Sequence, residues 1–212
     1  MSCTAHCSAS AGHFDPKHAA KDRKRYERRG PDPTTRVILD ELSDRSAGRT
    51  LLDIGGGIGI IGLELAQSGI QHVVLVDATT SGLEVAREQF AKRGATARLE
   101  TRLGDFADFD SAPAADLVTL DRVVCCYPDY ERLLSRAGNS AQEALAWSYP
   151  RDRWYVRLGF AIENLILRAK RTAFRTFVHP APAMAAVLES TGLHIASRRQ
   201  TAMWCIELWT RN

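Results

Sequence analysis

The chain has 212 residues, of which 45% are hydrophobic and 25% charged, and its formal net charge is +3. This length suits one domain with a sizeable core. The small net charge disfavours a general nucleic-acid binder, and no apolar run reaches the roughly 18 residues that a membrane-spanning helix needs. Because the N-terminus lacks the apolar core of a secretory signal, the sequence predicts a cytoplasmic protein with reduced cysteines.

The first residues are expected to form a disordered tail over 1–12. Cys3, His6, Cys7 and His13 are potential zinc ligands. Their spacing matches no paired C-x-x-C arrangement, so the sequence predicts no metal site there.

A helical lid is expected over residues 13–48. Residues 15–30 carry many charges and helix-forming residues, which predicts a short basic helix. A second helix should follow the prolines, with Thr34 or Thr35 as its N-cap. Their position before the first strand suggests that these helices fold over the binding site and exclude water.

Residues 49–212 are expected to form a core in which strands and helices alternate. Runs of Val, Leu and Ile indicate parallel strands covered on both faces, and two adjacent final strands predict a hairpin. The strands are expected at 50–54, 72–77, 96–105, 115–121, 143–150, 194–201 and 202–211, and helices at 59–69, 81–94, 129–138, 152–170 and 182–191.

The long helix over 152–170 has an apolar stripe at helical spacing, which is expected to face the core. The alternative is that this face lies on a membrane surface or contacts a partner. The stripe comprises Trp154, Leu158, Ile162, Leu165, Ile166 and Ala169.

The start of this helix combines arginines with aromatic side chains. Arg151 and Arg153 precede Trp154 and Tyr155, a combination that suits a planar anionic substrate through ion pairing and stacking. Alternatively, the aliphatic stems of the arginines cover the core.

The stretch LLDIGGGIGIIGLEL (51–65) follows the first strand and opens a helix, which indicates a nucleotide-type ligand. Gly57, Gly59 and Gly62 satisfy the G-x-G-x-x-G dinucleotide fingerprint, and Asp77 follows 20 residues after Gly57. A glycine-rich turn without a ligand is the simplest alternative.

Carboxylates and an aromatic residue near the ends of the first three strands favour S-adenosylmethionine (SAM) over a dinucleotide. Asp53 would repel a pyrophosphate but attract a cationic amino-acid ligand. Asp77 can accept ribose hydroxyls of either cofactor. Asp105 can accept from the adenine amine, and Phe106 can lie against the ring. Leu120 ends the fourth strand, at the edge where such folds bind ligands.

These motifs, in this order, resemble the class I SAM-dependent methyltransferases. The matching stretches are LLDIGGGIG, VVLVDA, GDF and ADLVTLDRV, within residues 51–123. The resemblance implies an α/β Rossmann-like fold, with a seven-stranded, mostly parallel sheet, a terminal antiparallel strand and helices on both faces. It also implies SAM as the cofactor and a single methyltransferase domain over residues 13–212.

A looser likeness to the magnesium-protoporphyrin methyltransferase branch lies in the N-terminal HFD and the fourth motif. That branch has Ile-His-Tyr after this motif, whereas DRVVCCYPD here keeps Tyr127 without the histidine.

Carried over to this chain, the class I resemblance implies a cofactor site. Asp53, Gly55, Gly57 and Gly59 would bind the amino-acid portion, Asp77 with Ala78 the ribose, and Asp105 and Phe106 the adenine, while Leu120 would lie near the methionine.

The predicted function is methyl transfer from SAM to an O, N or S nucleophile of a small molecule, by in-line displacement at the carboxyl edge of the sheet. Positioning supplies most of the catalysis, and a base is needed only when the acceptor must lose a proton. His179 and Tyr127 are the candidate bases, although helix capping and wall packing are alternatives. Cys125 and Cys126 are expected to be small core residues.

Two other functions remain open at this stage, an NAD(P)-dependent oxidoreductase and a catalytically silent methyltransferase-like binding protein. A nucleic-acid acceptor is disfavoured because no N-P-P-Y-like motif follows the fourth strand, where the sequence reads LDRVVCC.

Overall fold

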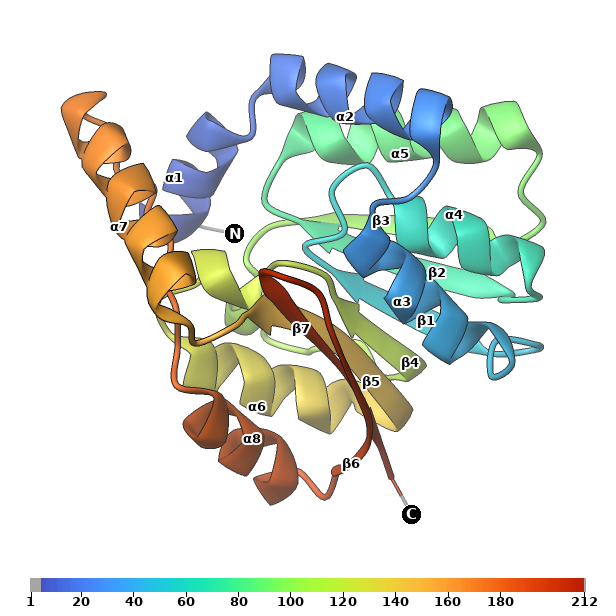
Figure 1. Ribbon diagram of the computed structural model, residues 1–212. Helices are drawn as coiled ribbons and strands as arrows, with labels where there is room; N and C mark the ends of the chain where they lie inside the picture. The colour runs from blue at the N-terminus through green and yellow to red at the C-terminus, as the bar shows by residue number, and fades with distance from the viewer. Residues whose placement is uncertain (1–4, 212) are drawn as a thin grey trace.

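The computed structural model describes residues 5–211 and is built around one seven-stranded sheet (Figure 1). The strand order is β3-β2-β1-β4-β5-β7-β6. Strands β1 to β5 pair in parallel, whereas β7 is antiparallel to both β5 and β6. The strands are β1 (Thr50–Ile54), β2 (His72–Asp77), β3 (Arg98–Leu103), β4 (Ala115–Leu120), β5 (Ala141–Pro150), β6 (His194–Gln200) and β7 (Trp204–Thr210). The predicted fold class is confirmed.

Helices cover both faces of the sheet. One core cluster joins α6 and α8 to one face, and a second joins α2, α3, α4 and α5 to the other. The helices are α1 (Ala5–His13), α2 (Pro16–Arg29), α3 (Pro33–Ser43), α4 (Ile60–Gln67), α5 (Thr80–Arg93), α6 (Tyr130–Ser140), α7 (Trp154–Ala169) and α8 (Ala181–Ser190), with short 3-10 turns η1 (Phe106–Asp108) and η2 (Val124–Cys126).

The inner strands are buried because their sequences are almost continuously apolar. In β2, for example, Val73 and Leu75 belong to clusters on the face covered by α4 and α5. Val74 and Val76 belong to the core cluster on the other face. Alternation of side chains across a strand puts one residue of each pair on each face, so a strand covered on both sides needs both kinds of position to be apolar.

The N-terminal segment differs from its expected form. Ala5–His13 is a helix, and within the predicted tail Cys7 and Ser10 are buried, while residues 1–4 lie outside the described part of the chain. His13 stacks on Phe174, with ring centroids 4.1 Å apart. Tertiary packing of this kind is not visible in local composition.

The N-cap of α3 is a correction to the sequence analysis. Asp32 occupies that position and Pro33 opens the helix, while Thr34 and Thr35 are buried inside its first turn. Proline at the first helical position is favoured because its fixed φ matches the helix and its missing N–H has no partner to lose. The basic helix α2 ends at Gly30, at a φ of 69°, as predicted.

The apolar stripe of α7 does not face the core, and that prediction is wrong. The helix packs through Val156, Phe160 and Leu167, which are buried. The large hydrophobic residues of the predicted stripe are instead exposed. Both faces of the helix are apolar, so periodicity alone could not identify the packed face.

No helix within residues 5–211 is long and apolar enough to cross a membrane.

Candidate active site

A cavity of about 550 Å³ lies at the carboxyl ends of the parallel strands. This volume is within the range of small-molecule and cofactor sites, which is about 300–1,000 Å³. Its walls come from the loop after β1, the ends of β2 and β3, the loop after β4, the N-terminal helices, and α7 with the segment after it. The sheet thus brings residues distant in sequence to one site.

Most residues predicted to bind the cofactor line this cavity. The exceptions are Gly59 and Leu120: Gly59 is the N-cap of α4, and Leu120 is fully buried in the core behind the site. The residues that line it are Asp53, Gly55, Gly57, Ala78, Asp77, Asp105 and Phe106.

The glycine-rich loop requires glycine at two positions in particular. Gly55 has a φ of +64°, and a Cβ there would lie 2.7 Å from Val123 Cγ2. Gly57 has a φ of +55°, and a Cβ there would meet nothing within 4 Å. Because Gly57 lines the cavity, that open space is the space a ligand would use. The bare backbone therefore allows a ligand to approach the main chain closely.

Asp53 is a buried carboxylate with one unpaired oxygen. Its Oδ1 accepts a hydrogen bond of 2.7 Å from Thr119 Oγ1 on β4, whereas Oδ2 is buried without a partner among the described residues. Burial raises the pKa of Asp53 to about 7, and the nearby Asp121 and Asp77 add to the shift. An unpaired buried carboxylate is costly, and a cationic ligand in the cavity would supply the missing partner.

Asp77 closes the glycine-rich loop from the end of β2. Its Oδ2 accepts from Gly57 N at 2.8 Å, and its Oδ1 accepts from both the backbone and the hydroxyl of Thr79. Burial raises the pKa of this carboxyl despite these bonds. A carboxylate has about four acceptor positions, and three are used here, so the arrangement leaves room for a single further hydroxyl donor.

Asp105 and Phe106 form the wall that follows β3. Asp105 Oδ1 accepts from Ala107 N, and both carboxylate oxygens lie within 3.0 Å of the Tyr127 hydroxyl. Burial and the Asp105 charge raise the pKa of Tyr127. This phenol therefore stays protonated at neutral pH and holds Asp105, which is a different task from that of a base.

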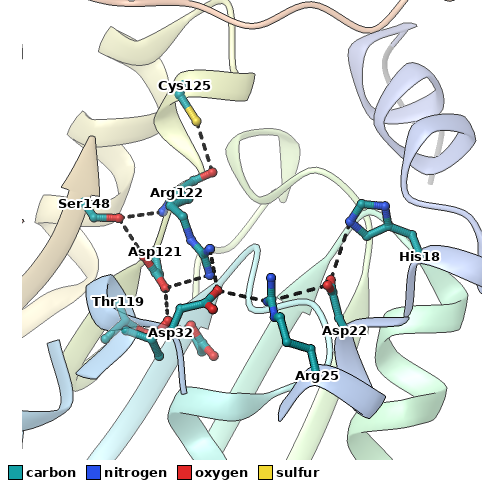
Figure 2. Close-up of polar contacts among 11 residues, drawn as sticks. His18, Asp22, Arg25, Asp32, Thr119, Asp121, Arg122, Cys125 and Ser148 are labelled. Atoms are coloured by element: carbon teal, nitrogen blue, oxygen red, sulfur yellow. Dashed lines mark hydrogen bonds and ion pairs between the residues drawn. The ribbon is translucent and has the colours of Figure 1, made fainter. Parts of the chain in front are cut away.

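A chain of ion pairs joins the lid helices to the loop after β4 (Figure 2). Arg122 donates to Asp32 at 2.8 Å and to Asp121 at 3.3 Å, and Asp32 also pairs with Arg25 on α2. Asp121 accepts in addition from Thr35 Oγ1 at 2.6 Å. The N-terminal helices are thereby attached to the floor of the cavity.

Sequence reasoning missed this chain of ion pairs. Its centre, Arg122, has a φ of +60°, an uncommon conformation for a residue with a side chain. Its backbone N–H donates to Ser148 Oγ, whose hydroxyl donates to Asp121. Nothing in the local sequence signals a pairing between residues 32 and 122, which only the fold brings together.

Aromatic side chains form a second group of cavity-lining residues, which we call the aromatic chamber. Phe14 and His13 from the N-terminal segment, Phe160 from α7, and Phe174 and Trp204 line it. Burial, with a smaller effect from His18, lowers the pKa of His13, so this imidazole is neutral at pH 7. His13 is thus a candidate base that the sequence analysis did not select, since it was assigned to the lid.

One carboxylate and two thiols also line this cavity. Glu163 of α7 lines it, as do both Cys125 and Cys126. The two Sγ atoms are 3.6 Å apart, and Cys125 donates to Arg122 O. The hydrogen bond to Cys126, followed by burial, raises the pKa of Cys125. These cysteines lie in η2 at the cavity wall.

His179 lies outside the residues that line the cavity. Its Nε2 is 2.9 Å from Tyr127 O, and its ring packs between Phe177 and Tyr130. Burial lowers its pKa. The nearby Asp129 caps α6 by accepting from Arg132 N.

The predicted substrate residues at the start of α7 are likewise absent from the cavity lining. Trp154 is exposed, and Tyr155 donates to Ala202 O. Arg151 donates to Thr201 O, in the turn between β6 and β7. No cluster of three or more His, Cys, Asp or Glu residues suited to a metal ion occurs within residues 5–211.

Residues 21–124 match the family model of the methyltransferase small domain. The structure is similar to that of magnesium protoporphyrin IX methyltransferase from Synechocystis with bound S-adenosylhomocysteine (SAH), with a TM-score of 0.77, 18% identity, and coverage of 97% of this chain and 99% of that one. In sequence over this segment, and in fold, the chain is similar to the class I methyltransferases. The methyl donor of this family is SAM.

Two curated methyltransferases share sequence with the chain. The magnesium-protoporphyrin O-methyltransferase of Rhodobacter capsulatus is 27% identical over 152 residues, or 68% of this chain and 64% of that protein. The ribosomal protein L11 methyltransferase of Geobacter metallireducens is 36% identical over 95 residues, or 44% of this chain and 32% of that protein. The chain thus spans less than two thirds of either relative.

Proposed function

We propose that this methyltransferase binds SAM in the cavity and transfers its methyl group to an O, N or S atom of a small, largely apolar and planar molecule. The observation that carries this proposal is Asp53, a buried carboxylate that lines the cavity and whose Oδ2 has no partner among the described residues. SAM carries an ammonium and a sulfonium, so it supplies positive charge where the chain has unpaired negative charge.

The charge of the cavity supports SAM over a dinucleotide. The carboxylates of Asp53, Asp77, Asp105 and Asp121 all line it. A pyrophosphate beside the glycine-rich loop would face this acidic set, at an energetic cost that a cationic ligand does not incur. The two arginines that line the cavity are already paired, Arg122 with Asp32 and Asp121, and Arg25 with Asp32.

The proposed roles follow the geometry. Asp53 would bind the amino-acid portion of SAM with the backbone of Gly55 and Gly57, Asp77 a ribose hydroxyl, and Asp105 with Phe106 the adenine. SAM itself supplies the electrophilic methyl group. The chain's own residues then have to orient the acceptor in line with it and exclude water.

The acceptor would bind in the aromatic chamber, beneath the N-terminal helices α1 and α2. Aromatic walls favour a flat apolar molecule by burial and stacking. His13 is neutral at pH 7 because its pKa is lowered, and it would take the proton of a phenol-like or amine acceptor. An acceptor that is already deprotonated needs no base.

The proposal is tested by ligand titration followed by turnover. The purified protein is heated with SAH, with SAM and with NADH, and we expect stabilisation by the first two only. A ligand at 100 times its Kd stabilises by about 2.7 kcal/mol, which is readily measured. Stabilisation by NADH alone would overturn the assignment.

Turnover separates the enzyme from a silent binding protein. Methyl-labelled SAM is incubated with a mixture of planar aromatic alcohols, amines and thiols, and release of SAH is followed. Ligand binding with no labelled product from any acceptor, including lipid and protein fractions, would favour the silent alternative.

A further inference from the structure

The exposed side of α7 is the most apolar surface feature of the described chain. Most of the large hydrophobic residues exposed within residues 5–211 belong to this helix. Apart from Tyr155, which donates to Ala202 O, they are Trp154 (76% exposed), Leu165 (67%), Leu158 (52%), Ile162 (51%) and Ile166 (49%). We call these five residues the α7 face. Single exposed hydrophobic residues are ordinary on proteins, but a contiguous group indicates a binding surface.

The α7 face forms one strip along the helix. At about 100° per residue, its five members fall within an arc of roughly 120°, and they extend over about 18 Å of helix length. Val156, Phe160 and Leu167, on the opposite side, anchor the helix to the protein. Figure 1 shows α7 at the margin of the molecule, with α1 beside it and its outer side uncovered by any labelled element.

The charges around the strip are strongly basic. Residues 151–175 contain seven basic and two acidic side chains, a net charge of +5 in a chain whose total is +3. Arg168 and Lys170 fall on either side of the strip by helical geometry. Of the two acids, Asp152 is paired with Arg157, and Glu163 lines the cavity. The strip therefore faces outward, with the basic residues Arg168 and Lys170 along its two sides.

The apolar strip and its basic surroundings decide which kind of partner the α7 face can bind. In a two-fold dimer of this chain, the same patch would meet itself, so the basic rims would oppose each other at a cost. Spanning a bilayer is excluded for α7, whose 16 residues reach only about 24 Å, short of the hydrocarbon thickness. An anionic bilayer offers an apolar layer beneath a negative surface, which matches an apolar strip with a basic rim.

We infer that α7 docks this protein on the surface of an anionic lipid bilayer, with the α7 face inserted among the lipids and Arg168 and Lys170 at the headgroups. Trp154, at the start of the helix, suits the interface because its ring is apolar and its N–H is polar. Phe160, from the opposite side of the same helix, lines the cavity, so the docked helix would separate the bilayer from the acceptor chamber.

The test measures binding to vesicles and does not depend on methyl transfer. The full chain is mixed with liposomes of phosphatidylcholine alone, and of phosphatidylcholine with about 30 mol % phosphatidylserine, and the bound fraction is measured by sedimentation. We expect binding to the anionic vesicles, with Trp fluorescence shifted to the blue, and weak binding to the neutral ones. Added salt should reduce the binding through screening.

Two variants and a control make the result specific. The double variant Leu158→Ser/Leu165→Ser should lower vesicle affinity at least about tenfold, since each side chain loses burial in lipid. Arg168→Glu/Lys170→Glu should lower affinity for anionic vesicles alone. Ile195→Ser, which removes an exposed apolar residue of β6, should leave it unchanged. Circular dichroism and SAH-induced heat stabilisation confirm that each variant is folded.

Three results would overturn the inference. One is absence of vesicle binding by the unmodified chain. Another is equal vesicle binding by the chain and the Leu158→Ser/Leu165→Ser variant. The third is that the unmodified chain does not bind vesicles but forms a dimer, or a complex with an acidic protein, and that this variant forms neither.

Discussion

The substitution Asp53→Asn should make the ligand-free protein more stable while weakening its affinity for SAH. Asp53 is 1% exposed, and burial raises its pKa from the ordinary 3.8 to about 7. The amide keeps the size of the side chain and an oxygen that can accept from Thr119 Oγ1. The change therefore removes the charge with little change of shape.

The expected gain in stability follows from the pKa. A shift of about three units corresponds to about 4 kcal/mol. Because the folded-state pKa is the higher one, the penalty is absent below about pH 4, grows as the pH rises to about 7, and is constant above that. The new amide N–H₂ is buried and needs an acceptor, which costs about 1–3 kcal/mol. We expect a net gain of about 1–3 kcal/mol at pH 8.

The same substitution that stabilises the ligand-free protein should weaken its binding of SAH. Removing one partner of a buried charge pair costs about 3–5 kcal/mol, which corresponds to a Kd at least about 100-fold weaker. The affinity of the unmodified protein for SAH should also fall by up to about tenfold per pH unit as the pH drops below the Asp53 pKa of about 7. The variant lacks this titration, so its Kd should depend much less on pH.

Urea unfolding at pH 5 and pH 8, with calorimetric titration of SAH at the same pH values, measures both effects. The unmodified protein and Asp53→Asn should differ more in unfolding free energy at pH 8 than at pH 5. Thr119→Val is a matched control, because it removes the hydrogen bond to Asp53 but keeps the carboxylate. A variant that binds SAH as tightly as the unmodified protein at pH 8 would refute the pairing of Asp53 with the cofactor.

Three further predictions separate the roles of neighbouring groups. Gly57→Ala should cost about 1–2 kcal/mol of stability, since a left-handed φ disfavours Ala, and it should weaken SAH binding further by filling cavity space, as calorimetry would show; unchanged affinity would place the ligand elsewhere. His13→Gln should slow turnover without changing the Kd of SAH, whereas His179→Gln should change neither by more than about twofold; a slow His179→Gln enzyme would reverse these roles. Arg122→Gln should increase proteolysis of α2 in the ligand-free protein, because its ion pair to Asp32 on the lid side is lost; equal proteolysis would show that the lid is held by packing.

The sheet could be predicted from the sequence because its signals are local. Apolar runs mark the strands, and Gly94, at a φ of +60°, ends α5 where the sequence indicates. The glycine-rich loop and the acids near it are adjacent to strand ends, so parallel topology alone gathers them. For the same reason Asp53, Asp77 and Asp105 were found at one cavity.

The errors concern residues whose environment depends on distant segments. The α7 helix has apolar residues on two sides, and its packing against Cys125 of η2 and Trp204 of β7 decides which side is buried. His13 enters the cavity only because Phe174, 161 positions later, stacks on it. The Arg122 ion pairs join segments 90 residues apart. No local periodicity or propensity carries such information.

The chain of ion pairs also makes binding at the cavity floor relevant to the lid. Asp53 and Asp121 lie close enough for the charge of Asp121 to raise the Asp53 pKa, and Asp121 also pairs with Arg122, which contacts Asp32 at the start of α3. A cation bound at Asp53 offsets the repulsion between the two carboxylates. Because Asp121 also holds Arg122 and Thr35, through which the N-terminal helices are attached, cofactor binding and lid closure should stabilise each other, as reciprocal coupling requires.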